Sequence, residues 1–75
     1  MTVHVEFVKH ERSKYRCTDY TFIDRHTSEE IAFGSYHGAE GFELIDFRTA
    51  GVEMYVSAAV AWTALNRKLI EQYGY

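Results

Sequence analysis

The sequence predicts one small α+β domain, in which an antiparallel sheet of four or five strands packs against one C-terminal helix. Between residues 2 and 56, short runs of alternating apolar and polar residues are separated by polar or glycine-containing stretches, as in a meander of half-buried strands. From residue 58 to residue 73 the chain is rich in alanine and leucine and contains no glycine, which is typical of a helix. Because the chain has 75 residues, residues 1–75 can form one hydrophobic core but not two.

The first two strands are predicted from alternation and composition. Every second side chain is apolar over residues 2–8, which predicts a half-buried strand. Residues 9–14 are mostly polar and charged and predict a loop. Residues 15–23 contain several tyrosine, threonine, phenylalanine and isoleucine residues, which favour a second strand. The polar residues 24–30 then predict a turn.

A third strand is predicted over residues 30–36, where Ile31 and Phe33 fall on one face. A short helix is the alternative, because Thr27 and Glu30 have the spacing of a capping box. A glycine inside the segment and the lack of a helical apolar spacing favour the strand.

A glycine-rich turn at residues 38–41 leads into a fourth strand over residues 42–47. Residues 52–56 alternate again and predict a fifth strand, with Ser57 as the N-cap of the helix that follows. Alternatively, Thr49 caps one long helix that runs through this segment. Both interpretations remain open from the sequence.

The predicted helix carries apolar side chains around more than half of its circumference. A helix that packs on one sheet usually has a narrower apolar stripe, of about 100° or somewhat more. Either a second copy of the chain covers the additional surface, or alanine occupies exposed positions because it favours helix. The residues expected at such a dimer interface are Ala58, Ala61, Trp62 and Leu65.

Charge is unevenly distributed along the chain, which has a net charge of −3. Residues 17–53 contain eight acidic side chains and two arginines. An acidic lobe of this kind would attract a basic surface of another protein, although acidic turns also serve solubility alone. The residues expected to contact the partner are Glu29, Glu30, Glu40, Glu43 and Asp46.

The segment from residue 9 to residue 22 is basic and aromatic, and it suggests an alternative in which the protein binds nucleic acid. The overall pI of about 5.7 argues against this alternative, because nucleic-acid-binding domains usually present a dominant basic face. The residues expected to contact nucleic acid in this alternative are Lys9, Arg12, Lys14, Tyr15 and Arg16.

Residue types used in catalysis and metal binding are present, but their spacing is not that of a known site. The four histidines and Cys17 lack the paired spacing of zinc ligands. The runs 24–26 and 35–37 contain Ser, His and Asp, but adjacent strand residues point to opposite faces, so neither run is expected to form a nucleophile–base pair. We therefore expect no enzymatic activity, no catalytic residue, no metal and no cofactor.

A single cysteine excludes an intrachain disulfide and fits a reducing compartment. The start of the chain does not resemble a signal peptide, and no apolar run approaches the ~20 residues of a membrane span. These observations predict a cytoplasmic protein that does not enter a membrane.

Taken together, these features favour a non-catalytic, acidic protein-binding module. It would act as an inhibitor or adaptor that binds a basic surface of a larger host macromolecule, as small phage or mobile-element proteins do in the host cytoplasm. A small nucleic-acid-binding protein is the alternative. A third hypothesis is an enzyme or ligand-binding subunit whose site is completed across a dimer.

Overall fold

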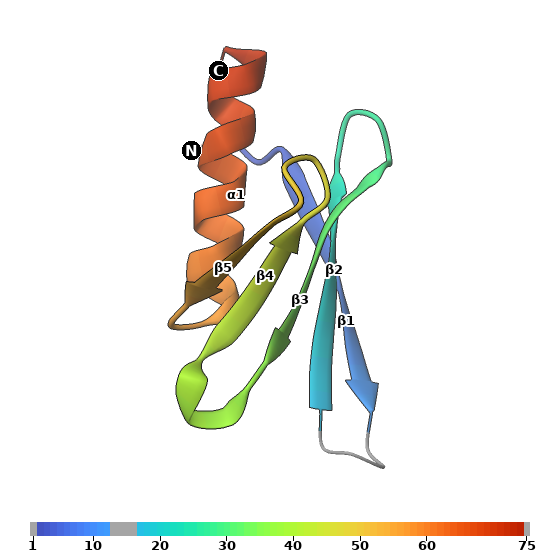
Figure 1. The fold of residues 1–75 in the computed structure, drawn as a ribbon. Helices are drawn as coiled ribbons and strands as arrows, with labels where there is room; N and C mark the ends of the chain where they lie inside the picture. The colour runs from blue at the N-terminus through green and yellow to red at the C-terminus, as the bar shows by residue number, and fades with distance from the viewer. Residues whose placement is uncertain (1, 13–16, 75) are drawn as a thin grey trace.

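The computed structural model describes residues 2–12 and 17–74. Across these residues the chain forms five strands in the order β1-β2-β3-β4-β5, each antiparallel to the next, followed by one helix (Figure 1). The elements are β1 (Val5–Arg12), β2 (Cys17–Asp24), β3 (Glu30–Tyr36), a 3-10 turn η1 (Gly38–Glu40), β4 (Phe42–Asp46), β5 (Gly51–Tyr55) and α1 (Ala58–Tyr73). The predicted fold class, an antiparallel sheet packed against one C-terminal helix, is confirmed.

The first strand is displaced relative to the prediction. It was predicted over residues 2–8, but β1 continues through residues 9–12, which were predicted to be a loop. These charged residues remain in the strand because each pairs with β2, beginning with Lys9 opposite Tyr20. The loop prediction is therefore wrong for residues 9–12.

The structure resolves the choice between a fifth strand and a longer helix in favour of the strand. β5 pairs with β4, and the Ser57 side chain caps α1 by accepting a hydrogen bond of 3.3 Å from the Val60 N–H. At the other end of the helix, Gly74 has a φ of 82° and donates its N–H to the Ile70 carbonyl. A left-handed residue of this kind ends a helix and strongly favours glycine.

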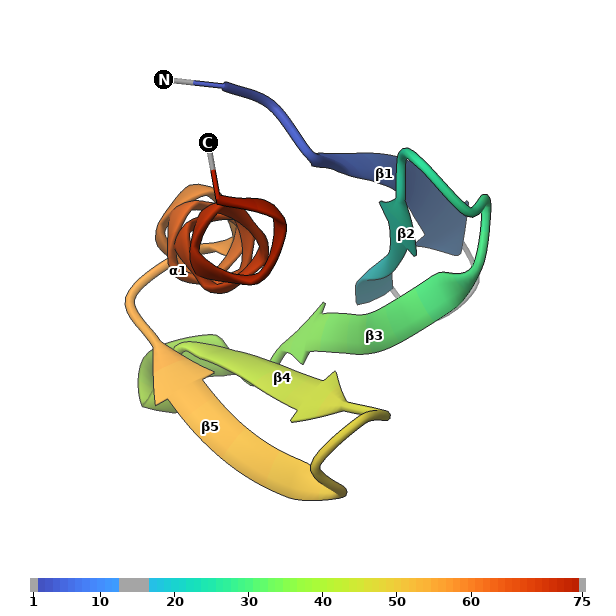
Figure 2. The same ribbon diagram turned by 90° about the horizontal axis from the view of Figure 1, so that it is seen from above.

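The sheet curls around one side of α1, so that strands face the helix from more than one direction (Figure 2). Phe22, Phe42 and Leu44 from the strands meet Leu65 and Leu69 from the helix, and all five side chains are buried. This curvature, rather than a second copy of the chain, explains why the apolar face of the helix is wide.

The predicted dimer interface is therefore wrong for three of its four residues. Ala58, Ala61 and Leu65 are 8%, 0% and 0% exposed within one chain, because they belong to the core beneath the curled sheet. Trp62 is partly buried and lies at the edge of the core.

Gly34 permits close packing between β3 and β4. A Cβ atom at this position would lie 2.3 Å from the ring of Phe42, which is itself fully buried. The glycine is thus required by a neighbouring aromatic ring rather than by an unusual backbone conformation.

Candidate functional site

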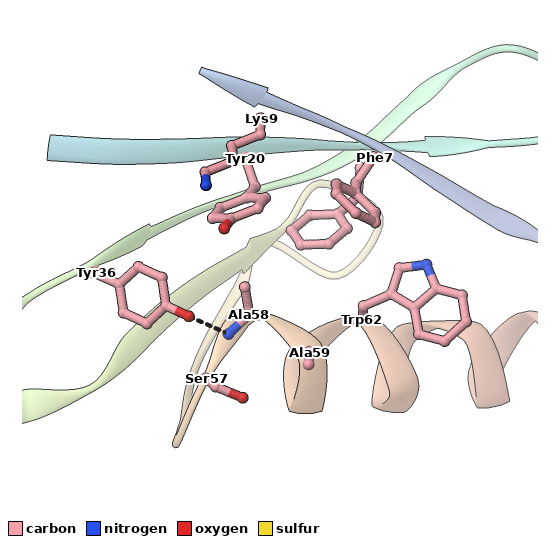
Figure 3. A pocket seen from close by; sticks show the side chains of 9 residues that line it. Phe7, Lys9, Tyr20, Tyr36, Ser57, Ala58, Ala59 and Trp62 are labelled. Atoms are coloured by element: carbon pink, nitrogen blue, oxygen red, sulfur yellow. Dashed lines mark hydrogen bonds between the residues drawn. The ribbon is translucent and has the colours of Figure 1, made fainter. Parts of the chain in front are cut away.

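An open groove of about 530 Å³ lies between the first turns of α1 and the part of the sheet formed by β1, β2 and β3 (Figure 3). Five of its nine lining residues are aromatic: Phe7, Tyr20, Phe22, Tyr36 and Trp62. We call this feature the aromatic groove. It lies on the side of the molecule where the strands extend beyond the N-terminal end of the helix (Figure 1).

The strand register brings these aromatic residues together. Phe7 pairs with Phe22, and Tyr20 pairs with Gly34, so alternation places Phe7 and Tyr20 on the helix-facing side. The ring centroids of Phe7 and Tyr20 are 5.9 Å apart, and those of Tyr20 and Tyr36 are 6.3 Å apart. Phe7 and Tyr36 remain 54% and 42% exposed, which is unusual for large side chains on the covered side of a sheet.

Hydrogen bonds hold two of the groove walls in place. The Trp62 Nε1–H donates to the Val5 carbonyl at 2.8 Å, which fixes the indole ring against β1. The Ala58 N–H donates to the Tyr36 hydroxyl at 3.0 Å, which ties the ring to the first residue of the helix (Figure 3). The groove is therefore largely preformed, and a ligand would lose little entropy in ordering it.

Among the described lining residues, Lys9 supplies the positive charge at the groove. Its Nζ lies 3.2 Å from a carboxylate oxygen of Glu11, and both side chains are well exposed. The hydrogen bond to Glu11, together with the nearby Tyr20 and the Glu11 charge, raises the pKa of Lys9. Lys9 is therefore a permanent cation at neutral pH, but one that already has an acidic partner.

Among the described residues, the polar groups that line the groove do not form a catalytic arrangement. Ser57 is engaged as the helix N-cap. A serine–histidine contact does occur elsewhere, because Ser35 and His37 are two residues apart and their side chains meet at 3.2 Å. This corrects the expectation that residues 35–37 form no such pair. Glu43 approaches the same Nε2 atom of His37 at 3.6 Å, so it does not orient the ring from the opposite nitrogen as a catalytic triad requires.

The opposite end of the helix is closed by a hydrogen-bonded polar cluster that consists of His4, Asp24, His26, Asn66 and Tyr73. His4 is fully buried, and its Nδ1 lies 2.6 Å from Nε2 of His26. The Asn66 Oδ1 accepts the backbone N–H groups of His4 at 2.7 Å and Val5 at 3.2 Å. The polar cluster attaches the N-terminal segment to the helix over more than sixty residues of sequence.

Asp24 connects this polar cluster to the turn after β2. Burial alone would raise the pKa of Asp24, but hydrogen bonds from the Tyr73 hydroxyl and from the backbone N–H groups of His26 and Thr27 more than compensate and lower it. Among the described residues, no group of three or more His, Cys, Asp or Glu side chains is arranged to hold a metal ion.

The acidic residues predicted to form one lobe lie at two ends of the molecule. Glu29 and Glu30 are exposed where β3 begins, whereas Glu40 is exposed beyond its end. The seven residues of β3 separate them by roughly 20 Å at about 3.3 Å per residue. Glu43 is half-buried and lies at the same end as Glu40. These residues therefore do not form a single surface.

Asp46 is not a surface residue. It follows Phe42 and Leu44 on the buried side of β4 and is 1% exposed. Its carboxylate lies 3.5 Å from Arg48 Nε and 3.7 Å from Lys68 Nζ, so it is neutralised within the chain. The prediction that Asp46 contacts a partner is wrong, and the period-two pattern of β4 already contained the signal for its burial.

The residues of the nucleic-acid alternative are only partly placed. Lys9 lines the groove beside Tyr20, and Arg12 is the last residue of β1. Lys14, Tyr15 and Arg16 lie outside the described residues. The sequence did not reveal that Phe7, Tyr36 and Trp62 join Tyr20 at one site, because they come from elements far apart in the chain.

Within residues 2–12 and 17–74, no helix combines the length and the apolar character that a membrane crossing requires. Comparison of the chain with protein-family models, with curated proteins and with solved structures finds no match.

Proposed function

We propose that this protein is a non-catalytic module that binds another protein, and that the aromatic groove is its binding surface. The observation that carries the proposal is the open volume of about 530 Å³ beside five aromatic side chains, which residues 2–12 and 17–74 leave unfilled (Figure 3). Tyrosine and tryptophan dominate the binding energy of many protein interfaces, because they bury a large area at a low cost in side-chain entropy. An apolar side chain of a partner would fit this site.

The composition of the described part of the groove favours a protein over a nucleic acid. Apolar and aromatic groups dominate the described lining residues, and Lys9, the cation among them, is paired with Glu11. Binding of nucleic acid requires several cations that replace the counterions of phosphates. The net charge of −3 opposes such binding further.

We further propose that the module acts as an inhibitor or adaptor by occupying a surface of a larger host macromolecule, as small phage or mobile-element proteins do in the host cytoplasm. The exposed acidic residues at both ends of β3 would steer the protein toward a partner with positive potential. In this proposal they affect encounter, while the aromatic groove supplies affinity.

A library of short random peptides, selected for binding to the immobilised protein, tests the proposal. We expect enrichment of peptides with an aromatic or aliphatic anchor residue. Binding should shift the emission of Trp62, which is the one tryptophan of the chain and lines the groove. Phe7→Ser should weaken binding at least tenfold.

Val52→Ser is the matched control, because Val52 is also large, apolar and exposed but lies on β5 and does not line the groove. It should bind as the wild type does. Equal binding by Phe7→Ser and wild type would overturn the proposal. Tight, salt-sensitive binding of oligothymidylate without peptide binding would favour the nucleic-acid alternative instead.

A further inference from the structure

The outer edge of β1 begins under the helix and then becomes uncovered. The His4 carbonyl accepts the Arg25 N–H at 2.8 Å and therefore points toward β2, whereas the His4 N–H donates to Asn66 of the helix. The Val5 N–H and carbonyl instead bond to Asn66 and Trp62, on the side away from β2. Because the direction alternates along an antiparallel strand, the N–H and carbonyl groups of Phe7, Lys9 and Glu11 also point away from β2.

These outward groups have no strand beside them among the described residues, because β1 is the first strand of the sheet. Within the described part of β1, the hydrogen bonds that the helix makes to this edge are those at Val5. A shallow hollow lined by Val3, Val5, Glu6, Phe7 and Trp62 shares Phe7 and Trp62 with the aromatic groove and continues it around the edge of β1. Phe7 and Lys9 therefore present outward backbone groups that have no strand partner among the described residues, and they also contribute side chains to the aromatic groove.

We propose that the partner adds an extended segment to the outer edge of β1 as a sixth strand, with an apolar residue opposite Phe7 and an acidic residue opposite Lys9. This inference rests on the proposed function and specifies how the groove is used. The apolar residue would lie beside Phe7 and Trp62, where the groove is open. The acidic residue would pair with Lys9. In antiparallel pairing, a basic residue two positions nearer the N-terminus of the partner segment would pair with Glu11, since opposite charges on directly facing residues stabilise strand pairing.

A second copy of the chain fits this edge poorly. When two copies of β1 pair antiparallel, the register that pairs the largest number of outward backbone groups places Lys9 opposite Lys9 and Phe7 opposite Glu11. Of the two neighbouring registers, one places Phe7 opposite Lys9, and the other places Lys9 opposite Glu11 but leaves Phe7 without an apolar partner among the described residues. The first two registers put a charged side chain where the groove is apolar, and the register with Lys9 opposite Lys9 also brings like charges together. Alternating charges on an edge strand disfavour pairing with unrelated strands, so they also supply specificity.

The experiment uses the peptide TKTETLT with blocked ends, which in antiparallel pairing places leucine, glutamate and lysine opposite Phe7, Lys9 and Glu11. Nuclear magnetic resonance of the full chain should show slower amide hydrogen exchange at Phe7, Lys9 and Glu11 when the peptide is added. The amides of Glu6 and Val8, which already face β2, should change little. The same peptide N-methylated at its lysine, glutamate and leucine should bind at least tenfold more weakly.

Proline substitutions provide a matched pair of protein variants. Lys9→Pro removes an outward N–H without removing a bond to β2, as is tolerated on edge strands, and it should abolish peptide binding. Met54→Pro is the control on the opposite edge. The Phe47 N–H bonds to Ile31 in β3, so alternation across β4 and β5 directs the Met54 N–H away from the sheet. This variant should bind as the wild type does.

The outcomes separate this inference from the proposed function. If TKTETLT or a library peptide shifts Trp62 emission while Lys9→Pro binds it normally, strand addition is wrong but the groove remains a protein-binding site. If TKTETLT does not bind, and the peptides selected from the library carry no acidic residue, the proposed pairing of an acidic residue with Lys9 is wrong. A concentration-dependent dimer abolished by Lys9→Pro would make a second copy the occupant and overturn the choice of a foreign segment.

Discussion

The two ends of α1 differ in how the chain completes its surface. At the C-terminal end, the polar cluster connects the N-terminal segment, the turn after β2 and the helix through hydrogen bonds. At the N-terminal end, aromatic rings of β1, β2 and β3 face the helix across an open groove. Within the described residues, one end therefore has polar groups paired within the chain, and the other leaves apolar area uncovered. In a chain of 75 residues, whose burial is limited, uncovered aromatic area is costly, which is why we propose that it binds a partner.

The core between the two ends should be the most sensitive region. Leu65→Asp places a charge at a side chain that is fully buried within one chain, and its cost should exceed the whole stability of roughly 5 kcal/mol expected for so small a domain. We expect an unfolded protein by circular dichroism. Val60→Asp, at an exposed position of the same helix, should melt within a few degrees of the wild type. A folded monomer of Leu65→Asp would show that Leu65 is not in the core.

Asn66→Ala tests whether the polar cluster stabilises the fold. The variant removes an acceptor from the backbone N–H groups of His4 and Val5 and a donor to the Thr2 carbonyl. We expect a loss of about 2–4 kcal/mol, seen as a fall in Tm on the order of 10–20 °C. Phe7→Ala in the groove should cost less than about 1.5 kcal/mol, because its side chain is half exposed. If Asn66→Ala and Phe7→Ala lost the same free energy of unfolding, the two ends of the helix would not differ in their contribution to stability.

The contrast between the ends was only partly predictable from the sequence. Local patterns predicted the architecture: alternation and a glycine turn marked β3 and β4, and Ser57 marked the start of the helix. The missed features depend on pairing between distant segments. Nothing local to His4 indicates that it meets His26 and the helix, and nothing local to Phe7 indicates that Trp62 lies beside it.

The errors on charged residues have a related cause. Residues 9–12 were predicted to be a loop because they are polar, yet pairing with β2 keeps them in a strand. Asp46 was predicted to be exposed because it is acidic, yet its position in β4 places it under the helix beside Lys68. In both cases tertiary pairing outweighed the preference of the individual residue. Strand periodicity would have been the better guide for Asp46.

Acidification should loosen the polar cluster. The pKa of Asp24 is lowered in the folded protein, so its stabilising contribution is fully present above its ordinary value of 3.8 and is lost as the pH falls through the folded value. Urea unfolding between pH 6 and about pH 2 should show this decline. Tyr73→Phe removes the hydroxyl that donates to Asp24, so the stability of this variant should decline less steeply as the pH falls. Hydrogen bonds to Tyr55 and Lys68 also lower the pKa of Glu53. Because Tyr73→Phe leaves these bonds intact, wild type and Tyr73→Phe should both keep the part of the pH dependence that comes from Glu53.

The smallest expected effect comes from charge reversal of exposed acidic residues. It tests which end of the molecule a partner approaches. Glu40 lies beyond Tyr36, at the end of the molecule that carries the aromatic groove, whereas Glu29 and Glu30 lie near the polar cluster. Charges steer association over a Debye length of about 8–10 Å, so Glu40→Lys should change the association rate of a basic groove-binding peptide more than Glu29→Lys does. We expect a decrease of about two- to threefold at low salt that disappears at about 1 M salt, with the dissociation rate unchanged. Stopped-flow detection of Trp62 emission measures both rates. A larger effect from Glu29→Lys would place the approach of the partner at the polar cluster and reverse the functional contrast between the two ends.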